Sequence, residues 1–402
     1  FGTARRVIML FMEGAPSQFD TFDYKPNLGR GGTMRSPFEF VESGQSGLPI
    51  SEVFPSLAEH ADHLCLLNAM ETSSSSHSAA ETQLHTGGNS MLDTPSLGSW
   101  AFYGHGPTAQ QLPGYVTVNY PGESKNFGAG FLPAKYQGVK MEIGSSKRAY
   151  FGETDSVVPN ALNRHYTRGG QARQLDLVQQ MNRAFADELG GDDRIEAVIE
   201  SIDQGFILQD SFRELVDTSN VAEETQQLYG IDQPATSDFG QQCLLARRLA
   251  ESDVRFIQLS HDGWDHHSNI EEKLAEKAGE VDKPIAGLLT DLERRGLLEE
   301  TLVVWGGEFG RTAKGSGGGR DHQNRGYSMW MAGSGVRGGM RFGETDELGK
   351  EIVDGRVGME DLHATILHLL GFDPKRLDFK RSESEQLLGS AAEGRVVSEI
   401  LV

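Results

Sequence analysis

Five acidic or imidazole side chains lie within seven consecutive residues of this sequence. They are His261, Asp262, Asp265, His266 and His267. Asp262 and His266 are four residues apart, so they would share one face if the segment entered a helix. A carboxylate and an imidazole at that spacing suit a divalent metal of borderline softness. A solvated polar loop is the plain alternative, but the density of such groups favours a site.

The surrounding elements would place this cluster at the edge of a sheet. Residues 254–259 are rich in strand-forming side chains and predict a buried strand. Two further apolar runs, 7–12 and 301–307, also predict strands, and acidic residues soon follow each. Helical patterns alternate with these strands, which predicts an α/β fold with a mainly parallel sheet between helices. Right-handed crossovers bring the ends of such strands to one edge, so the polar groups should converge there.

Further candidate ligands follow the other two strands. Glu13 and Asp20 come after the first strand, although a capped turn explains Asp20 as well as metal binding does. Glu308 comes after the last strand, and a glycine-rich loop then leads to the pair Asp321 and His322. Two-metal hydrolysis needs donors of this kind around cations about 4 Å apart, together with a nucleophile.

A hydroxyl nucleophile is predicted at the start of a helix. Serines at 73–76 precede His77 and Ser78, and the residues that follow suit a helix ending at Gly87. The free N–H groups and dipole of a helix N-terminus favour an anion. Ser78 would therefore be placed to attack phosphorus or sulfur, with His77 or Asp321 assisting proton transfer. Helix capping alone is the alternative.

Two arginines are candidates for substrate binding. Arg311 follows the last predicted strand, and Arg320 ends the glycine-rich loop. A guanidinium group can bind the non-bridging oxygens of a phosphate or sulfate bidentately.

Composition limits the classes of partner. The net charge is −21, from 37 basic and 58 acidic residues, which argues against nucleic acid and anionic membrane surfaces. No apolar run reaches the roughly 18 residues that a membrane span requires. The two cysteines, Cys65 and Cys243, provide neither a disulfide framework nor zinc-type spacing. No linker is evident, so we expect one domain, 1–402, with a loop-rich insertion at 90–165 and a helical insertion at 171–230.

Motifs spread along the chain carry a family resemblance. They are FMEGAPSQFDTFDYKP (11–26), HTGG with PSLGSW (85–100), FGQQCLLARRLAESDVRFIQL (239–259), DGWDHHSN (262–269), GGEFGRT (306–312), GRDHQN (319–324) and EDLHATILHLLGFD (360–373). The chain resembles the sulfatase-like family catalogued as domain of unknown function 1501, within the alkaline phosphatase superfamily. The resemblance implies an alkaline-phosphatase-like sheet flanked by helices, with a site for one or two metals. In that superfamily pattern, Asp262, His266 and His322 would hold the first metal.

The resemblance also implies a second ion and a nucleophile. Asp20, or with less support Glu13, would bind the second ion, and Ser78 would be the nucleophile. Glu308 falls at a ligand position, but the next residue, Phe309, stands where the superfamily has histidine. A complete second metal site is therefore in doubt.

The resemblance implies a metal-dependent hydrolase of phosphate or sulfate esters, acting on a small molecule or glycan. Zn²⁺ suits the histidine-containing site best, with Mn²⁺ or Ca²⁺ as alternatives. No Cys/Ser-x-Pro-x-Arg motif occurs, so a formylglycine residue is not expected. A bacterial, periplasmic or secreted protein is implied. A non-catalytic exported binding or scaffold protein is the alternative, and a phosphomutase-like transferase is a third reading without a sugar-phosphate signature.

Overall fold

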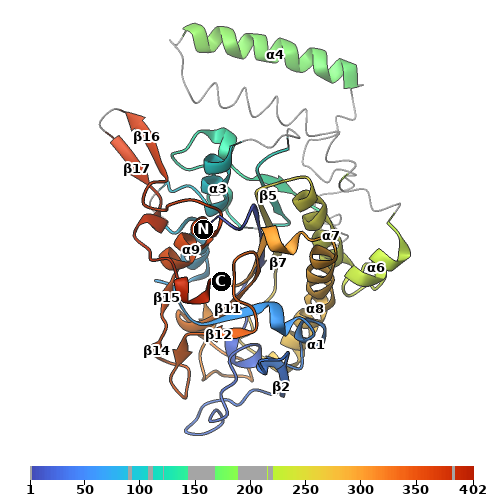
Figure 1. Ribbon diagram of the computed structural model, residues 1–402, viewed down its shortest axis with the longest axis vertical. Coiled ribbons are helices and arrows are strands. Elements are labelled where there is room, and N and C mark those ends of the chain that lie inside the picture. Colours follow the sequence, from blue (N-terminus) through green and yellow to red (C-terminus); the bar gives the residue numbers. More distant parts are fainter. Residues whose placement is uncertain are drawn as a thin grey trace.

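A mixed sheet forms the centre of the molecule (Figure 1). The computed structural model describes residues 2–88, 93–106, 112–120, 122–143, 168–188, 215, 221–382 and 385–402. In these residues the sheet has nine strands: β1 (Arg6–Met12), β4 (Leu64–Glu71), β5 (Tyr115–Val118), β6 (Val139–Met141), β7 (Phe256–His261), β8 (Thr301–Gly306), β11 (Arg325–Gly333), β12 (Met340–Phe342) and β15 (Val357–Gly358). Their order is β12-β4-β11-β8-β1-β7-β5-β6, with β15 also paired to β4.

Strand direction confirms the predicted α/β class. β1 pairs in parallel with β7 and β8, and β5 pairs in parallel with β6 and β7. β11 runs antiparallel to both of its neighbours, β4 and β8. The sheet is therefore mainly parallel.

Helices and small hairpins complete the described structure. The helices are α1 (Pro55–Ala58), α2 (His77–Thr86), α3 (Leu97–His105), α4 (Arg168–Glu188), α6 (Glu223–Tyr229), α7 (Ser237–Glu251), α8 (Ile270–Arg294) and α9 (Met359–Leu369). The strand pairs outside the main sheet are β2 (Phe40–Ser43) with β3 (Leu48–Ser51), β9 (Gly310–Arg311) with β10 (His322–Gln323), β13 (Glu344–Thr345) with β14 (Ile352–Asp354), and β16 (Asp378–Ser382) with β17 (Glu385–Leu388). Single 3₁₀ turns occur at Gln18–Asp20, Ala61–His63, Ser124–Phe127, Ala134–Tyr136, Leu298–Glu300, Ser390–Ala392 and Ser398–Ile400.

Each face of the sheet has its own apolar core, because successive side chains of a strand point to opposite faces. Ile8, Leu10 and Met12 of β1 belong to a core that includes the apolar sides of α7 and α8. The alternate residues of β1 belong to a second core that includes side chains of α3 and α9. Figure 1 shows α7 and α8 on one side of the strands and α3 and α9 on the other.

Strand register brings the predicted polar groups to one edge. Met12 of β1 lies opposite His261 of β7, and Phe11 lies opposite Gly306 of β8. The three predicted strands thus end side by side, in the order β8-β1-β7.

The helical predictions agree with the structure where it describes them. The helical patterns that alternate with the predicted strands correspond to α7, before β7, and α8, which contains Pro284, after it. Residues 189–214 and 216–220 of the predicted helical insertion lie outside the described residues. The single domain with two insertions stays a prediction, and α4, within the helical insertion, lies apart from the sheet (Figure 1). Among the described residues, no helix is both long and apolar enough to cross a bilayer.

Candidate metal centre

A glycine lets the loops after β1 and β7 lie against each other. Gly14 has a φ of +103°, and a Cβ built on it would come 2.6 Å from the backbone nitrogen of Asp265. The Trp264 N–H donates to the Glu13 carbonyl at 3.1 Å, and the Trp264 indole N–H donates to His261 Nδ1 at 3.0 Å. This contact fixes the backbone on which Asp265 stands.

Three histidines converge on the Asp265 carboxylate. Asp265 Oδ1 lies 3.0 Å from His267 Nε2 and 3.1 Å from His322 Nε2. The two imidazole nitrogens are 2.9 Å apart. His77, the first residue of α2, places its Nε2 3.5 Å from Asp265 Oδ2. The Asp265 and His267 side chains are 44% and 46% exposed, so solutes can reach the cluster.

The opposite nitrogen of each imidazole is tied to an oxygen. Nδ1 of His77 lies 2.5 Å from Glu308 Oε1, and Nδ1 of His322 lies 2.8 Å from the Ser75 carbonyl. Nδ1 of His267 lies 3.3 Å from Asp321 Oδ1. A carbonyl or ionised carboxylate oxygen only accepts hydrogen bonds, so each Nδ1 carries a proton, and in the neutral imidazole each Nε2 then presents a lone pair. Metal-binding histidines are usually held by an outer hydrogen bond of this kind.

These lone pairs fit a cation. Unprotonated Nε2 atoms 2.9 Å apart repel each other and the nearby carboxylate unless a proton or a cation lies among them. Tetrahedral ligands at zinc distances are about 3.3 Å apart, and the four separations given above run from 2.9 to 3.5 Å. Within the described part of the chain, Nε2 of His77 is buried and has no hydrogen-bond partner. The residues therefore fit a divalent metal: ligand atoms of His77, Asp265 and His322 lie within 4.8 Å of one another, and His267 lies against Asp265 and His322.

A second, more acidic group shares His77. His77, Glu81 and Glu308 place ligand atoms within 4.8 Å of one another. Glu308 is fully buried, and its Oε1 accepts the Gly14 N–H at 3.1 Å. Burial, with the charge of Glu308 as a further cause, raises the pKa of Glu81. The neighbourhood thus favours positive charge.

Hydrogen bonds and charges of neighbouring side chains also shift the pKa values of His77 and Asp265. The hydrogen bond to Glu308 raises the pKa of His77. Burial alone would raise the pKa of Asp265, but the hydrogen bond and charge of Arg311, with His322 and His77, lower it to about 2. Asp265 is therefore ionised in the pH range in which proteins are usually assayed.

Phe309 supports the imidazoles. Its side chain is 1% exposed, and its ring centroid lies 4.8 Å from that of His77 and 4.7 Å from that of His322. An apolar residue at this position is part of the wall that holds the two rings.

The structure groups Asp265 and His267 with His322, in place of Asp262 and His266. Residues 262–266 are irregular, and the next helix, α8, begins only at Ile270. The helical spacing that motivated Asp262 and His266 therefore does not apply. Asp262 is exposed, while His266 is buried with both ring nitrogens unpaired among the described residues. Asp265 and His267 belong to the same group of five acidic and imidazole residues at 261–267, and this density of polar groups was the sequence signal that could have identified them.

Both predicted substrate-binding arginines are buried. The Arg320 guanidinium bonds Asp20 through Nε to Oδ2 at 2.7 Å and Nη2 to Oδ1 at 3.2 Å, and both side chains have no exposed area. Asp20 also accepts from the Ser17 hydroxyl at 2.5 Å, so its charge is compensated without a metal. Arg311 is 1% exposed and binds oxygens of the protein itself. Neither guanidinium faces the solvent from which a substrate would approach.

Ser78 lies in the first turn of α2, as predicted. Its hydroxyl is exposed and donates to Glu123 Oε1 at 3.4 Å. The neighbouring His77 enters the cluster, so the helix start does bring a hydroxyl-bearing segment to the candidate centre.

Residues 4–401 match the model of a family described as "Protein of unknown function (DUF1501)". The chain belongs to this family. The resemblance inferred from the motifs is thereby confirmed. No curated protein matches the chain.

Solved structures similar to this DUF1501 chain include ester-cleaving enzymes. PsFucS1 sulfatase from Pseudoalteromonas sp. is 13% identical, with 91% of this chain and 67% of that chain covered and a TM-score of 0.42. Phosphonate monoester hydrolase SpPMH from Silicibacter pomeroyi is 10% identical, with 98% and 76% covered and a TM-score of 0.41. A protein in the alkaline phosphatase superfamily from Vibrio parahaemolyticus is 11% identical, with 100% and 71% covered and a TM-score of 0.42. At such scores the likeness does not extend to the details of a site.

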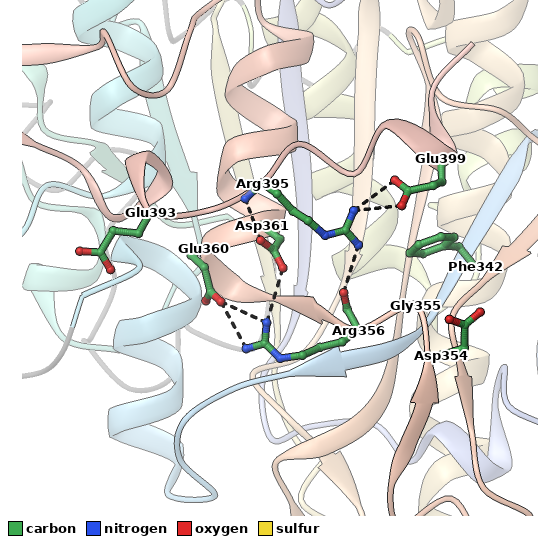
Figure 2. A pocket seen from close by; sticks show the side chains of 9 residues that line it. All are labelled: Phe342, Asp354, Gly355, Arg356, Glu360, Asp361, Glu393, Arg395 and Glu399. Atoms are coloured by element: carbon green, nitrogen blue, oxygen red, sulfur yellow. Dashed lines mark hydrogen bonds and ion pairs between the residues drawn. The ribbon is translucent and has the colours of Figure 1, made fainter.

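A separate surface cavity of about 720 Å³ lies between α9, β14 and the C-terminal segment (Figure 2). Its charged lining includes Arg356 and Arg395, which are paired with Glu360 and Glu399. None of the cluster residues lines it.

Proposed function

We propose that this DUF1501 protein is a metal-dependent hydrolase of phosphate or sulfate esters. The observation that carries the proposal is the convergence of three histidine Nε2 atoms on one carboxylate, with every Nδ1 tied to an oxygen. Asp265, His267, His322 and His77 would hold the principal cation. Glu308 and Glu81 would support a second, weaker ion beside His77.

The donor set favours zinc. Three imidazoles and one carboxylate are ligands that Zn²⁺ accepts in tetrahedral geometry, with Mn²⁺ or Ca²⁺ as alternatives. When bound, the ion supplies positive charge to balance the negative charge that develops on phosphoryl or sulfuryl oxygens. Arg311 and Arg320 are buried and engaged, so an anionic substrate would depend on that charge.

Ser78 is the proposed nucleophile. Its oxygen would bond to phosphorus or sulfur as the bond to the leaving alcohol breaks, and water would then hydrolyse the covalent intermediate. Glu123, to which the hydroxyl donates, gives the Ser78 proton an acceptor. We assign His77 to the cation, and Asp321 to the orientation of His267, in preference to proton transfer.

A formylglycine nucleophile is not part of the proposal. Both cysteines are free and fully buried: Cys65 lies in the core on one face of the sheet and Cys243 in the core on the other. Neither is near the cluster in sequence or on a loop at the sheet edge.

The alternative is a non-catalytic exported binding or scaffold protein, which Phe309, at an expected ligand position, would favour. That residue packs against His77 and His322 and so strengthens the centre. Export to the periplasm or beyond stays a prediction from the resemblance.

The test uses the full chain purified without added metal. We expect at least one divalent ion per chain by elemental analysis, and turnover of an aryl phosphate or aryl sulfate that chelation abolishes. Asp265→Ala and His322→Ala should lose both metal and turnover. A protein without bound ion and without a thermal shift on adding Zn²⁺, Mn²⁺ or Ca²⁺ contradicts the proposal. Bound metal without turnover on either ester would favour the scaffold.

A further inference from the structure

Arg311 is a buried cation, and each of its three guanidinium nitrogens donates to a protein oxygen near the cluster. Nε donates to the Ala15 carbonyl at 2.9 Å, and Nη1 donates to the Arg320 carbonyl at 3.3 Å. Nη2 donates to Asp265 Oδ1 at 2.6 Å and also to the Gly14 carbonyl. The one guanidinium therefore joins the loops that follow β1, β7 and β9.

The backbone of Arg311 is fixed as firmly as its side chain. Its N–H donates to Gln18 Oε1 at 2.8 Å, and Gln18 Nε2 donates to its carbonyl at 2.7 Å. The side chains of Gln18 and Arg311 are both buried. Arg311 can therefore act as a rigid reference point for the carboxylate that it contacts.

Asp265 needs such a reference point. It stands on an irregular loop with its side chain 44% exposed, and its other side-chain partners in the described chain are imidazoles. With Nη2 on Oδ1, the carboxylate is turned so that Oδ1 faces His267 and His322 while Oδ2 faces His77. Without that bond the carboxylate would be free to turn toward water.

We propose that Arg311 is a positioning residue that sets the orientation of Asp265 for cation binding, a role that rests on the proposed function. It replaces the substrate contact expected from the sequence, because the guanidinium does not reach solvent. A lysine ammonium is a compact point charge and cannot reach all the oxygens that the guanidinium binds, so lysine cannot fully replace arginine here.

The test compares zinc binding by the metal-free full chain of wild type, Arg311→Lys and Arg311→Gln. Arg247→Gln is the matched control, because Arg247 is also nearly buried but pairs with Glu251 and Asp291 between α7 and α8. Calorimetry should show zinc affinity about 10- to 100-fold weaker in both Arg311 variants, with the lysine variant the less affected. Arg247→Gln should lower the melting temperature of the metal-free chain but bind zinc as wild type does.

The outcomes separate this inference from the proposed function. Wild-type zinc affinity in a folded Arg311 variant overturns the positioning role and leaves the hydrolase intact. Equal weakening in Arg247→Gln also overturns it, because loss of affinity would then follow loss of stability. A wild-type chain that binds no zinc overturns both. Should Arg311→Gln fail to fold, the lysine variant decides.

Discussion

The histidine cluster and the cavity of Figure 2 contain similar kinds of charged residue but arrange them in opposite ways. In the cavity each guanidinium faces carboxylates: Arg395 bonds both oxygens of Glu399, and Arg356 meets Glu360 and Asp361. At the cluster, imidazole nitrogens and carboxylate oxygens face one another and need a proton or a cation between them. The charged groups of the cavity therefore neutralise one another, whereas those of the cluster fit a cation.

This difference leads us to expect function at the cluster and not in the cavity. Exposed ion pairs contribute about 0–1 kcal/mol each and need no further partner. Nitrogen and oxygen lone pairs that face one another raise the free energy of the folded state unless a proton or a cation lies between them. Substitutions in the cluster should therefore change activity, and substitutions in the cavity should not.

The largest effect is expected at the central carboxylate. Asp265→Asn keeps the side-chain volume but removes the charge, so zinc affinity and ester turnover should both fall on the order of 100-fold or more. Asp262→Asn is the matched control, since Asp262 is exposed and only three residues away. Calorimetry and an aryl ester assay measure the two quantities. The reverse ranking would restore Asp262 as the ligand.

Loss of the proposed nucleophile should lower turnover without changing zinc affinity. Ser78→Ala removes the hydroxyl in the first turn of α2, so turnover should fall at least about 100-fold while zinc affinity stays unchanged. Ser76→Ala is the control, because the Ser76 side chain makes no capping hydrogen bond. Full activity of Ser78→Ala would make water the attacking group.

Replacement of His85, a buried histidine outside the cluster, should change the stability of the fold but not zinc binding or turnover. Burial, with His363 nearby, lowers the pKa of His85 to about 3, so the folded chain keeps it neutral while the unfolded chain protonates it near its ordinary value. A depressed histidine pKa means that stability is present above about pH 6.5 and is lost as pH falls, at about 1.4 kcal/mol per pH unit for this group. Urea unfolding between about pH 7.5 and pH 5.5 should show a shallower pH dependence in His85→Phe.

The same variant sharpens the comparison between histidines of one helix. Nε2 of His85 is buried and unpaired, like that of His77, but its ring lies against Phe11 and Tyr120. We therefore expect zinc affinity in His85→Phe to equal that of wild type. Weaker binding would mean that convergence of donors is not the deciding feature.

The smallest effect is expected in the cavity. Arg395→Gln breaks an exposed ion pair with Glu399, so the free energy of unfolding should fall by about 0–1 kcal/mol. Turnover and zinc affinity should not change. A large loss of turnover would assign function to the cavity and reverse the comparison.

The sequence was sufficient to predict the sheet and the edge at which the polar groups meet. Apolar runs and helix–strand alternation are local signals. They predicted that the ends of β1, β7 and β8 meet at one edge of the sheet, and the structure has the three strands side by side. It was also sufficient to bring His77, Glu308 and His322 into one candidate set. His77 begins α2, Glu308 follows β8, and His322 begins β10, shortly before β11.

The choice among neighbouring acids and histidines was beyond a sequence reading. The path of residues 262–269 depends on contacts with distant segments: a Cβ on Gly319 would lie 2.1 Å from the carbonyl carbon of His267. Such contacts decide that Asp265 and His267, and not Asp262 and His266, face His322. The burial of Arg320 depends likewise on Asp20, three hundred residues away in the chain. No local pattern encodes a partner at that separation.

The close approach at Gly14 makes this position intolerant of change during evolution. A single methyl group there would meet the Asp265 backbone nitrogen at 2.6 Å and displace the whole ligand-bearing loop. In a random library selected for ester hydrolysis, substitutions at 14 should be purged. Gly279→Ala in α8, where a Cβ meets nothing within 4 Å, should instead be enriched, because alanine is about 0.5–1 kcal/mol more favourable in a helix.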